Sequence, residues 1–481
     1  MTSALFLVLS ILALLLVLCL VAVSCLIYAT RHKPRSALNN LDYLLVYASQ
    51  SGQAEQYAKH TATSLIHSGY SVGLISIDEL NQDILLSNQT ILWMVSTYGE
   101  GDGPDTAQPF IEQFFEQTLN LHHQRYAILA LGDRRYANFC SFGQGLEQWL
   151  NRCGAQALFT SVHVDQMQAQ DLAQFASALS RVAHISLAQY DQAQTWHNLK
   201  LQKRQLLNAG SQGTGLYHLQ FSLDEHIDWQ SGDIALIQCI NTATQIAEFI
   251  QKYQLNPEIA EQLRSKNLRS IEDTPSDVNT MTTWPDLPKR EYSIASLRDE
   301  QHLDLVVRHQ VDGLGSSLLT QHLGMQDSIQ IAIRANPSFH LDALNTPCIF
   351  IGNGSGIAGL MAHLKQRQRT GQHQNWLIYG ERQQAFDAIF NEQLTVWQQG
   401  QHLTHLDRVY SRDGQQDRYV QDILLRQADQ LKDWVAQGAK IYVCGSLNGM
   451  AQGVDDALLQ VLGQAVVADL KKQQRYLRDV Y

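Results

Sequence analysis

The chain has 481 residues, which is too long for one ordinary core and suits about three domains. Its formal net charge is −11, so we do not expect nucleic-acid binding, because phosphate contacts need clustered Lys and Arg. The seven cysteines are scattered and form no CxxC pair, so we predict neither a disulfide framework nor a metal site.

The N-terminal region carries a long apolar run. Residues 4–30 contain no charged side chain, and a helix of this length spans the roughly 30 Å apolar core of a bilayer. Arg31, Lys33 and Arg35 follow at once, and the positive-inside rule then places the rest of the chain in the cytoplasm. A cleaved signal peptide is the alternative, but neither a basic n-region nor a small-residue cleavage site is present. We therefore predict a transmembrane helix at residues 4–30 and a single-pass membrane protein with cytoplasmic C-terminal domains.

After this run, short apolar stretches alternate with helical ones. This rhythm is typical of a doubly wound parallel sheet with helices on both faces, and it predicts an α/β domain at residues 41–187. The expected strands are residues 43–48, 72–77, 91–96 and 127–131, and the first helix is expected at residues 54–67. A polar, Gln-rich stretch follows, and we predict a linker at residues 188–208.

The rest of the chain divides into a β-rich part and a second α/β part. Strand patterns at residues 215–223, 233–238, 292–296 and 303–309 predict a β-rich domain at residues 209–343, with a short helical insertion at residues 242–286. From residue 344 the βα rhythm returns and continues to residue 481. Its expected strands are residues 348–352, 376–380, 404–410 and 440–445, each with a helix after it.

The turn after the first predicted strand is suited to a phosphate. Residues 47–55 are rich in small and hydroxylated side chains, and Ser49 and Ser51 add hydroxyl donors to the backbone N–H groups at a helix N-terminus. The turn is not a Walker loop, because Gly-Lys-Ser/Thr is missing. A single terminal phosphate on a larger, otherwise uncharged group therefore fits best.

Two further strand ends supply aromatic side chains. Residues 96–102 follow the third strand, and residues 131–140 follow the fourth. Ligands of open α/β sheets bind beyond the carboxyl ends of the strands, so Tyr98 and Tyr136 can stand on either side of a flat ring.

Together the three segments resemble the flavodoxin-like FMN domain of the diflavin reductases. That family includes the sulfite reductase flavoprotein subunit and the microsomal NADPH–hemoprotein reductase. The resemblance implies that residues 49–54 hold the FMN phosphate and that Tyr98 and Tyr136 stack on the isoalloxazine. The FMN-binding residues that it implies are Ser49, Gln50, Ser51, Gly52, Gln53, Ala54, Ser96, Thr97, Tyr98, Gly99, Leu131, Gly132, Asp133, Tyr136, Asn138, Phe139 and Cys140.

A second set of motifs lies in the β-rich domain. Arg290 can bind a pyrophosphate, Tyr292 can lie against a ring, and Ser293 can reach a flavin edge. With the turn at residues 313–316, they resemble the FAD-binding signature of the ferredoxin–NADP reductase fold, a FAD-binding β-barrel followed by an NADP-binding domain. The FAD-binding residues that the resemblance implies are Arg290, Glu291, Tyr292, Ser293, Gly313, Leu314, Gly315 and Ser316.

The Gly-rich turn at residues 352–359 follows a strand and opens a helix, as a dinucleotide pyrophosphate requires. The order of later strand ends also resembles the NADP domain of this family. The nicotinamide-cofactor residues that it implies are Gly354, Ser355, Gly356, Ser411, Arg412, Tyr419, Gln421 and Tyr481.

The C-terminus completes the resemblance. The family's hydride-transfer trio of Ser, Cys and Asp corresponds to Ser293, Cys444 and Asp479, and its terminal aromatic, which covers the flavin, corresponds to Tyr481. A carboxylate near the nicotinamide can stabilise the positive charge that develops as hydride leaves. These four residues are the catalytic residues that we predict.

The chain departs from the family at several places. The helical insertion before Arg290 is shorter than usual, and Asp417 stands where relatives have a Lys for the cofactor 2′-phosphate, with Arg418 beside it. We predict NADPH as the electron donor, with NADH as the alternative. Three other family contacts are replaced, by residues 303–305, His309 and Gly453.

The predicted function is electron transfer from NADPH through FAD to FMN and on to a membrane-associated protein acceptor. A heme protein or a ferric-chelate reductase subunit would serve as that acceptor. The alternatives are the flavoprotein component of sulfite reductase and a non-catalytic, flavin-binding membrane scaffold. Acidic residues near the FMN loops form either a docking face for a basic partner or a solvated surface: Glu100, Asp102, Asp105 and Glu112.

Overall fold

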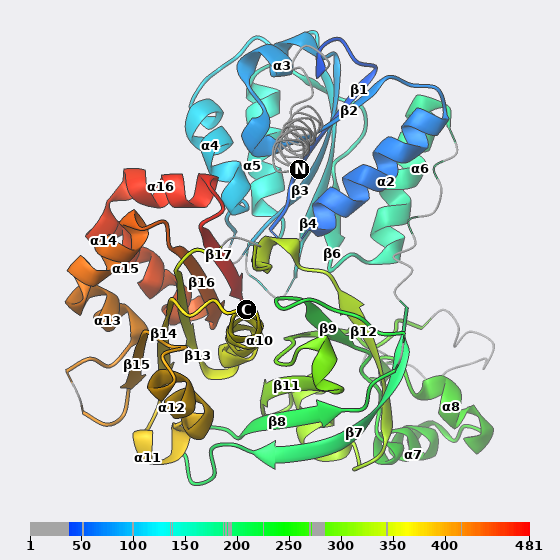
Figure 1. Cartoon of the computed structure of the whole chain (residues 1–481). Coiled ribbons are helices and arrows are strands. Elements are labelled where there is room, and N and C mark those ends of the chain that lie inside the picture. The colour runs from blue at the N-terminus through cyan, green and yellow to red at the C-terminus, as the bar shows by residue number, and fades with distance from the viewer. Residues whose placement is uncertain are drawn as a thin grey trace, which may run out of the picture. The chain divides into compact units, whose positions relative to one another are not determined.

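The computed structural model describes residues 38–481, apart from residues 51, 99–100, 135, 137, 186, 188–189, 191–194, 225, 269–270, 272–283, 343–344 and 415. The chain divides into two compact units, Met1–Tyr190 and Asp191–Tyr481 (Figure 1). The apolar run at residues 4–30 lies outside the described residues. Among the residues that are described, no helix combines the length and the apolar character that a membrane span needs.

The first unit contains a parallel sheet with the strand order β2-β1-β3-β4-β5, and β6 also pairs with β4. All its pairings are parallel, and the order is the one expected of a flavodoxin-like domain. The strands are β1 (Tyr43–Ala48), β2 (Val72–Ser76), β3 (Thr90–Ser96), β4 (Arg125–Gly132), β5 (Gln156–Ala157) and β6 (Val162–Asp165).

Helices cover both faces of this sheet, as Figure 1 shows. One core includes the buried Trp93, Phe110 and Trp149, and the other includes Tyr57 and Phe175. Because both faces are covered, the central strands are buried almost throughout. The helices are α2 (Gln53–His67), α3 (Gln82–Ser87), α4 (Gln108–Phe110), α5 (Ser141–Arg152) and α6 (Ala169–Ala183).

The second unit begins with an antiparallel sheet of order β10-β9-β12-β7-β8-β11. A bridge between Ile294 and Leu305 joins the two ends of this order, so the sheet closes into the predicted barrel. Its strands are β7 (His197–Leu206), β8 (Leu216–Phe221), β9 (Ile234–Ile237), β10 (Arg290–Ser293), β11 (Leu303–Arg308) and β12 (Ser328–Arg334).

Strand β7 corrects the predicted linker at residues 188–208. His197, Leu199 and Leu201 are buried, while the residues between them are exposed. This alternation is that of a strand with one face on the core, although the polar and Gln-rich composition favoured a linker. The barrel therefore begins at His197.

The predicted insertion is a small helical layer beside the barrel. It contains α7 (Ala243–Tyr253) and α8 (Ala260–Leu263), which share their own apolar core. A capping box at Thr242 and Gln245 starts α7, since each side chain accepts the other residue's backbone N–H.

The C-terminal part of the second unit is a parallel sheet of order β15-β14-β13-β16-β17. The order reverses between β13 and β16, which is where ligands bind in sheets of this kind. The strands are β13 (Cys348–Asn353), β14 (Asn375–Glu381), β15 (His405–Tyr410), β16 (Lys440–Gly445) and β17 (Tyr476–Val480). The main helices are α10 (Ile357–Arg369), α12 (Asn391–Gln399), α13 (Val420–Arg426), α14 (Ala428–Ala436), α15 (Gln452–Leu462) and α16 (Gln464–Lys472).

Helix α5 lies so close to strand β4 that one position on the helix excludes a side chain. A Cβ atom added at Gly143 would collide with the Cβ atom of Ala130, whereas one at Gly145 would lie 3.5 Å from Phe115. We expect Gly143→Ala to lower the free energy of unfolding of the first unit by about 1–3 kcal/mol through overpacking. The measurement is pulse proteolysis of the full chain in urea, with cleavage of the first unit followed by mass spectrometry.

Gly145→Ala is the matched control, because it has room and adds helix propensity. It should leave the stability unchanged or raise it by up to about 1 kcal/mol. Equal destabilisation by both substitutions would contradict the packing argument.

Candidate active site

Hydrogen bonds join the loops that follow β1, β3 and β4 in the first unit. The Ser96 hydroxyl donates to the Ala48 carbonyl at 3.1 Å, and the Thr97 N–H donates to the Leu131 carbonyl at 2.8 Å. Gln50 reaches from the first loop to Asp105, accepting its backbone N–H at 3.0 Å. The structure therefore brings together the three segments that the sequence predicted to surround FMN.

Gly101 is the closest contact between the second and third loops. Its φ is +131°, and a Cβ atom there would lie 2.8 Å from the Cβ atom of Asn138. The Ser141 hydroxyl donates to the Gly101 carbonyl, and the Phe142 N–H donates to the Thr97 hydroxyl at 3.3 Å. Only glycine allows this approach, which fixes the two loops carrying Tyr98 and Tyr136.

The first loop fits a phosphate. The Ser49 hydroxyl is buried and has no hydrogen-bond partner among the residues that the structure describes. A buried hydroxyl normally has a partner, so this one is free to bind a ligand oxygen. Gly52 takes the left-handed conformation, with φ at +80°, where helix α2 begins. The predicted residues Ser51 and Gly99 lie outside the described residues.

Cys140 differs from its predicted role as a flavin contact. Its thiol donates to the Ala130 carbonyl at 3.2 Å inside the sheet, and burial raises the pKa of this thiol to about 12. The backbone of Cys140 has a φ of +55° and turns the chain into helix α5. The side chain therefore shapes the loop from within the core.

In the second unit, the two predicted FAD segments lie together. A Cβ atom at Gly315 would be 2.7 Å from both the Arg290 side chain and the Tyr292 hydroxyl. The Ser316 hydroxyl accepts the N–H of Gln310 at 3.1 Å and so holds the turn closed. Arg290, Tyr292 and this glycine turn form one cradle, as a pyrophosphate beside a flat ring requires.

Glu291, another predicted FAD residue, has a structural partner. Its carboxylate binds the guanidinium of Arg334 through two hydrogen bonds, of 3.1 and 2.9 Å. This fork-to-fork geometry is the strongest ion pairing available between side chains, and it links β10 to β12. We therefore assign Glu291 to the barrel rather than to the cofactor.

The predicted trio meets at one carboxylate. The Ser293 hydroxyl donates to Asp479 Oδ2 at 2.7 Å, and the Cys444 thiol donates to the same oxygen at 3.7 Å. Ser293 comes from barrel strand β10, while Cys444 and Asp479 are register partners on β16 and β17. Residues separated by up to 186 positions thus form one cluster.

Burial controls the electrostatics of this cluster. It raises the pKa of Asp479, although the Ser293 hydroxyl partly opposes the shift by donating to the carboxylate. Burial also raises the pKa of the Cys444 thiol well above its usual range, and the neighbouring Asp479 raises it further. Burial therefore favours the neutral thiol of Cys444, and Asp479 is the one member of the trio that has a carboxylate form.

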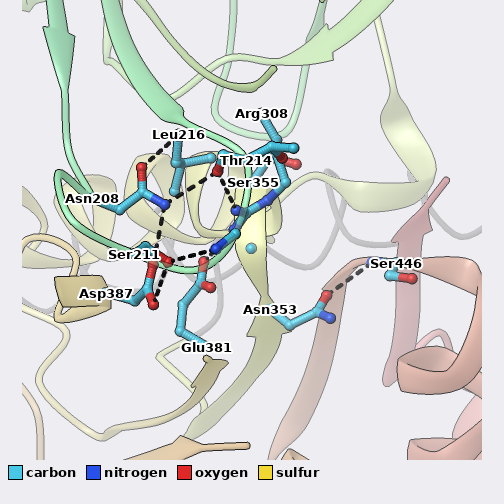
Figure 2. Close-up of polar contacts among 12 residues, drawn as sticks. Asn208, Ser211, Thr214, Leu216, Arg308, Asn353, Ser355, Glu381, Asp387 and Ser446 are labelled. Atoms are coloured by element: carbon cyan, nitrogen blue, oxygen red, sulfur yellow. Dashed lines mark hydrogen bonds and ion pairs between the residues drawn. The ribbon is translucent and has the colours of Figure 1, made fainter. Parts of the chain in front are cut away.

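The Gly-rich turn packs directly on the end of β16. A Cβ atom at Gly356 would collide with the carbonyl of Cys444, and one at Gly352 would lie 2.6 Å from the same oxygen. The Asn353 side chain accepts the N–H of Ser446 at 2.9 Å, a contact visible in Figure 2. The turn predicted to hold a dinucleotide is therefore fixed beside Cys444.

Tyr481 is tied to the same place. Its N–H donates to the Gly445 carbonyl at 3.0 Å, and its own carbonyl accepts the N–H of Leu447 at 3.0 Å. The Tyr481 hydroxyl lies 3.0 Å from Ser355 Oγ on the Gly-rich turn. The residue as a whole is 51% exposed, so it lies between this site and the solvent.

No sequence pattern indicated the ion pair near the Gly-rich turn. Arg308, at the end of β11, binds Glu381, at the end of β14, with 2.6 Å between Nη2 and Oε1 (Figure 2). The Tyr379 hydroxyl lies 2.8 Å from the carbonyl of Gly354 on the turn and 3.2 Å from Glu381 Oε1, so its one proton is shared between these two acceptors. Glu381 could have been suspected from its place at a strand end, but nothing in the local sequence marks Arg308.

A second polar contact lies beside this pair in Figure 2. Asp387 is fully buried and accepts hydrogen bonds from the Asn208 amide at 3.1 Å and the Ser211 hydroxyl at 2.9 Å. The Asn208 carbonyl oxygen in turn accepts the N–H of Leu216 at 2.7 Å. The turn between β7 and β8 of the barrel is thereby joined to Asp387, in the segment that follows β14.

The predicted residues at the far end of the nicotinamide site follow β15. The Ser411 N–H donates to the Glu381 carbonyl at 2.9 Å, which places this loop at the end of β14. The buried Gln421 Oε1 has no hydrogen-bond partner among the described residues. A Cβ atom at Gly453 would lie 2.6 Å from the Gln421 amide, so the glycine makes room for that side chain.

The replaced contact at residues 303–305 also has a structural explanation. Asp304 is buried in the barrel wall and pairs with His218 at 3.0 Å and with His302 at 2.8 Å. Burial opposes its ionisation, but the histidines outweigh burial and hold the pKa of Asp304 below its usual range. This carboxylate is therefore paired with two histidine side chains inside the barrel wall.

Two protein-family models match the chain. The flavodoxin model matches residues 45–177, and the oxidoreductase NAD-binding domain model matches residues 350–456. These ranges contain the FMN loops and the Gly-rich turn, respectively. The predicted cofactors FMN, FAD and NADPH agree with these matches and with the cradle around Gly315.

Relatives align over nearly the whole chain. The sulfite reductase [NADPH] flavoprotein alpha-component of Mannheimia succiniciproducens is 26% identical over 92% of this chain and 90% of its own length. The proteins of the same name from Yersinia enterocolitica and Bacillus subtilis are 27% and 25% identical, each over 91% of this chain and 89% of their own length.

These findings correct the predicted localisation. A single-pass membrane protein was expected, but no helix in the described part of the chain is long and apolar enough to span a bilayer. The relatives are named as components of sulfite reductase, which matches the alternative function and not a membrane-associated acceptor. Two findings support one conclusion: the two matched domains in their order, and the relatives that align over nearly the whole chain. The chain is an oxidoreductase that belongs to the diflavin reductase family.

Proposed function

We propose that this NADPH-dependent flavoprotein reductase delivers electrons to a hemoprotein of the sulfite reductase kind. The observation that carries the proposal is the buried cluster of Ser293, Cys444 and Asp479 beside the Gly-rich turn and Tyr481. The names of the relatives support the choice of acceptor.

Each cofactor has residues suited to hold it. We assign the FMN phosphate to the turn of Ser49 and Gly52, and the FAD pyrophosphate to Arg290 and the turn of Gly315. When bound, NADPH supplies a hydride, FAD accepts the electron pair, and FMN passes single electrons to the acceptor. The protein supplies position and charge.

Asp479 is the residue that we assign to charge stabilisation. As a carboxylate it would stabilise the positive charge that develops on a bound nicotinamide, and its burial would strengthen that interaction. Ser293 fixes the orientation of the carboxylate by donating at 2.7 Å. The neutral thiol of Cys444 adds a second donor and fills the space between the strand and the turn.

Tyr481 is assigned to excluding water from the flavin. Its backbone is held by two hydrogen bonds at the end of β16, and in the described structure its hydroxyl is hydrogen-bonded to Ser355. Breaking that one contact lets the ring turn aside without disturbing the sheet. The nicotinamide can then reach the site beside Cys444.

An assay of the purified full chain, loaded with FMN and FAD, tests the proposal. We expect NADPH oxidation with ferricyanide as the artificial acceptor, and sulfide formation when a sulfite reductase hemoprotein and sulfite replace ferricyanide. Failure with ferricyanide, with both flavins bound, would contradict the reductase activity. Success with ferricyanide but not with the hemoprotein would contradict the acceptor alone.

The raised pKa of Asp479 predicts a pH dependence of hydride transfer. The carboxylate is lost as the pH falls through this raised pKa, so the rate should decline at a pH above the usual range of an Asp. Asp479→Asn should slow single-turnover FAD reduction by about 100-fold and remove that decline. Stopped-flow absorbance of the FAD band measures both effects.

Asp469→Asn is the matched control for this experiment, because Asp469 is an exposed acid on the neighbouring helix α16. It should change neither the rate nor its pH profile. A pH profile of Asp479→Asn that parallels the unsubstituted chain would rule out Asp479 as the titrating group.

Because the Ser49 hydroxyl is free to bind a ligand oxygen, we predict that Ser49 contributes to FMN binding. Removing one hydrogen bond to a charged phosphate should weaken FMN binding by about 10- to 100-fold. Ser49→Ala should therefore lose FMN on dilution and filtration while it retains FAD, as measured by flavin fluorescence. Ser68→Ala, at the exposed end of α2, is the control that should retain both flavins; equal retention of FMN by the two variants would remove Ser49 from the site.

A further inference from the structure

We propose that Arg426 determines the specificity of this reductase for NADPH over NADH by neutralising Asp417. This inference rests on the proposed function, because it concerns the adenosine end of the same nicotinamide site. The 2′-phosphate distinguishes the two dinucleotides, so the charges that meet it decide between them. The relevant carboxylates are those at the ends of β14 and β15.

The loop after β15 provides cations for a phosphate. Arg412 and Arg418 are exposed, and the Arg418 guanidinium lies 3.4 Å from the Ser411 carbonyl at the start of the loop. Tyr419, 49% exposed, lies beside the Arg418 guanidinium, which is 5.9 Å from its ring centre. An Arg at such a strand end suits a 2′-phosphate, and an exposed aromatic can stack on adenine.

Asp417 stands inside this loop and would repel a phosphate if its charge were free. Its Oδ2 atom lies 2.6 Å from Nε of Arg426, and its side chain is only 22% exposed. Arg426 is the last residue of α13, and its Nη2 atom also lies 3.7 Å from Asp407. The pair is local, so the helix end brings a positive charge back to the loop that precedes it.

Glu381, the other acid at this edge, is also occupied. A free acid at the end of the second strand of such a sheet hydrogen-bonds the ribose 2′-hydroxyl and favours NAD. Here the Glu381 carboxylate is 3% exposed, binds Arg308 at 2.6 Å and accepts the Tyr379 hydroxyl at 3.2 Å. It faces the barrel side of the turn, so it is not available to the ribose.

Two other acids near Asp417, Asp413 in the loop and Asp422 in the first turn of α13, accept hydrogen bonds from backbone N–H groups. Asp413 accepts the N–H of Gln384 at 2.8 Å, and Asp422 accepts the N–H groups of Arg418 and Tyr419. Of the acids inside this loop, Asp417 alone has a cationic side chain as its direct partner in the described structure. A single substitution of Arg426 can therefore reverse the neutralisation of Asp417.

Arg426→Ala tests the inference by freeing the charge of Asp417. Calorimetry on the full chain, with its flavins bound, should show binding of adenosine 2′,5′-bisphosphate weakened about tenfold at low salt and less at high salt. Binding of ADP, which lacks the 2′-phosphate, should change by less than about twofold. The ratio of kcat/KM for NADPH to that for NADH, with ferricyanide as acceptor, should fall by the same factor as the bisphosphate affinity.

Two further variants separate charge from structure. Adding Asp417→Asn to Arg426→Ala should restore binding of the bisphosphate, because it removes the freed charge. Arg264→Ala removes an Arg of similar exposure that pairs with Glu261 on α8, and it should change binding of neither ligand.

The outcomes distinguish this inference from the proposed function. Unchanged bisphosphate binding by Arg426→Ala, an equal loss for both ligands, or no recovery in the double variant would each overturn the role of Arg426 while leaving the reductase intact. An unsubstituted chain that oxidises NADH in preference to NADPH would also overturn it. A chain that binds neither ligand would overturn the proposed function together with this inference.

Discussion

The contact between the Gly-rich turn and the end of β16 is the constraint on which the nicotinamide site depends. No side chain fits at Gly356, because a Cβ atom would collide with the Cys444 carbonyl. Gly445 faces Asn353 in the same way, with a φ of +139°. The register of β16 and β17 then places Asp479 beside Cys444, and the next hydrogen bond fixes the backbone of Tyr481. One close approach of two backbones thus positions the turn, the thiol, the carboxylate and the terminal ring.

The barrel contributes Ser293 to this cluster, and the C-terminal part contributes Cys444 and Asp479. The two parts of the second unit must therefore keep a fixed position relative to one another. Polar contacts between them include the pair of Arg308 with Glu381, the hydrogen bond of Asn208 to Asp387 and the contacts of Lys365 with Glu300 and Ala295. Such groups add little net stability, because burying them costs desolvation. They penalise every arrangement in which they lose their partners, however, since an unpaired buried charge is expensive. We infer that this seam keeps the Ser293 hydroxyl at hydrogen-bond distance from Asp479.

The sequence could predict those parts of the fold and the site that depend on local pattern. Buried strands, the turns at their carboxyl ends and the order of the cofactor motifs are local, and the structure places most of the predicted residues together there. Strand β7 was missed because its exposed face is Gln-rich and polar, although its other face carries Leu199 and Leu201. Arg308 was missed because its partner is 73 residues away, a distance that no local pattern records. The predicted membrane localisation was wrong, since the relatives are named as components of sulfite reductase, and no helix in the described part of the chain is long and apolar enough to span a bilayer.

The formal charge of an acidic residue in a sequence does not show how much of that charge a ligand meets in the folded protein. Glu381 and Asp417 both stand at positions where a free carboxylate would affect a bound cofactor, yet each has an Arg side chain as a direct partner, and the buried Asp304 is paired with two histidines. Asp479 differs, because its direct partners are a hydroxyl and a thiol, which are neutral. A bound cofactor would therefore meet the carboxylate of Asp479 without a directly bonded protein cation, unlike the carboxylates of Glu381 and Asp417. The distinction decides which acid acts on the nicotinamide, and it is made by tertiary partners rather than by the residue type.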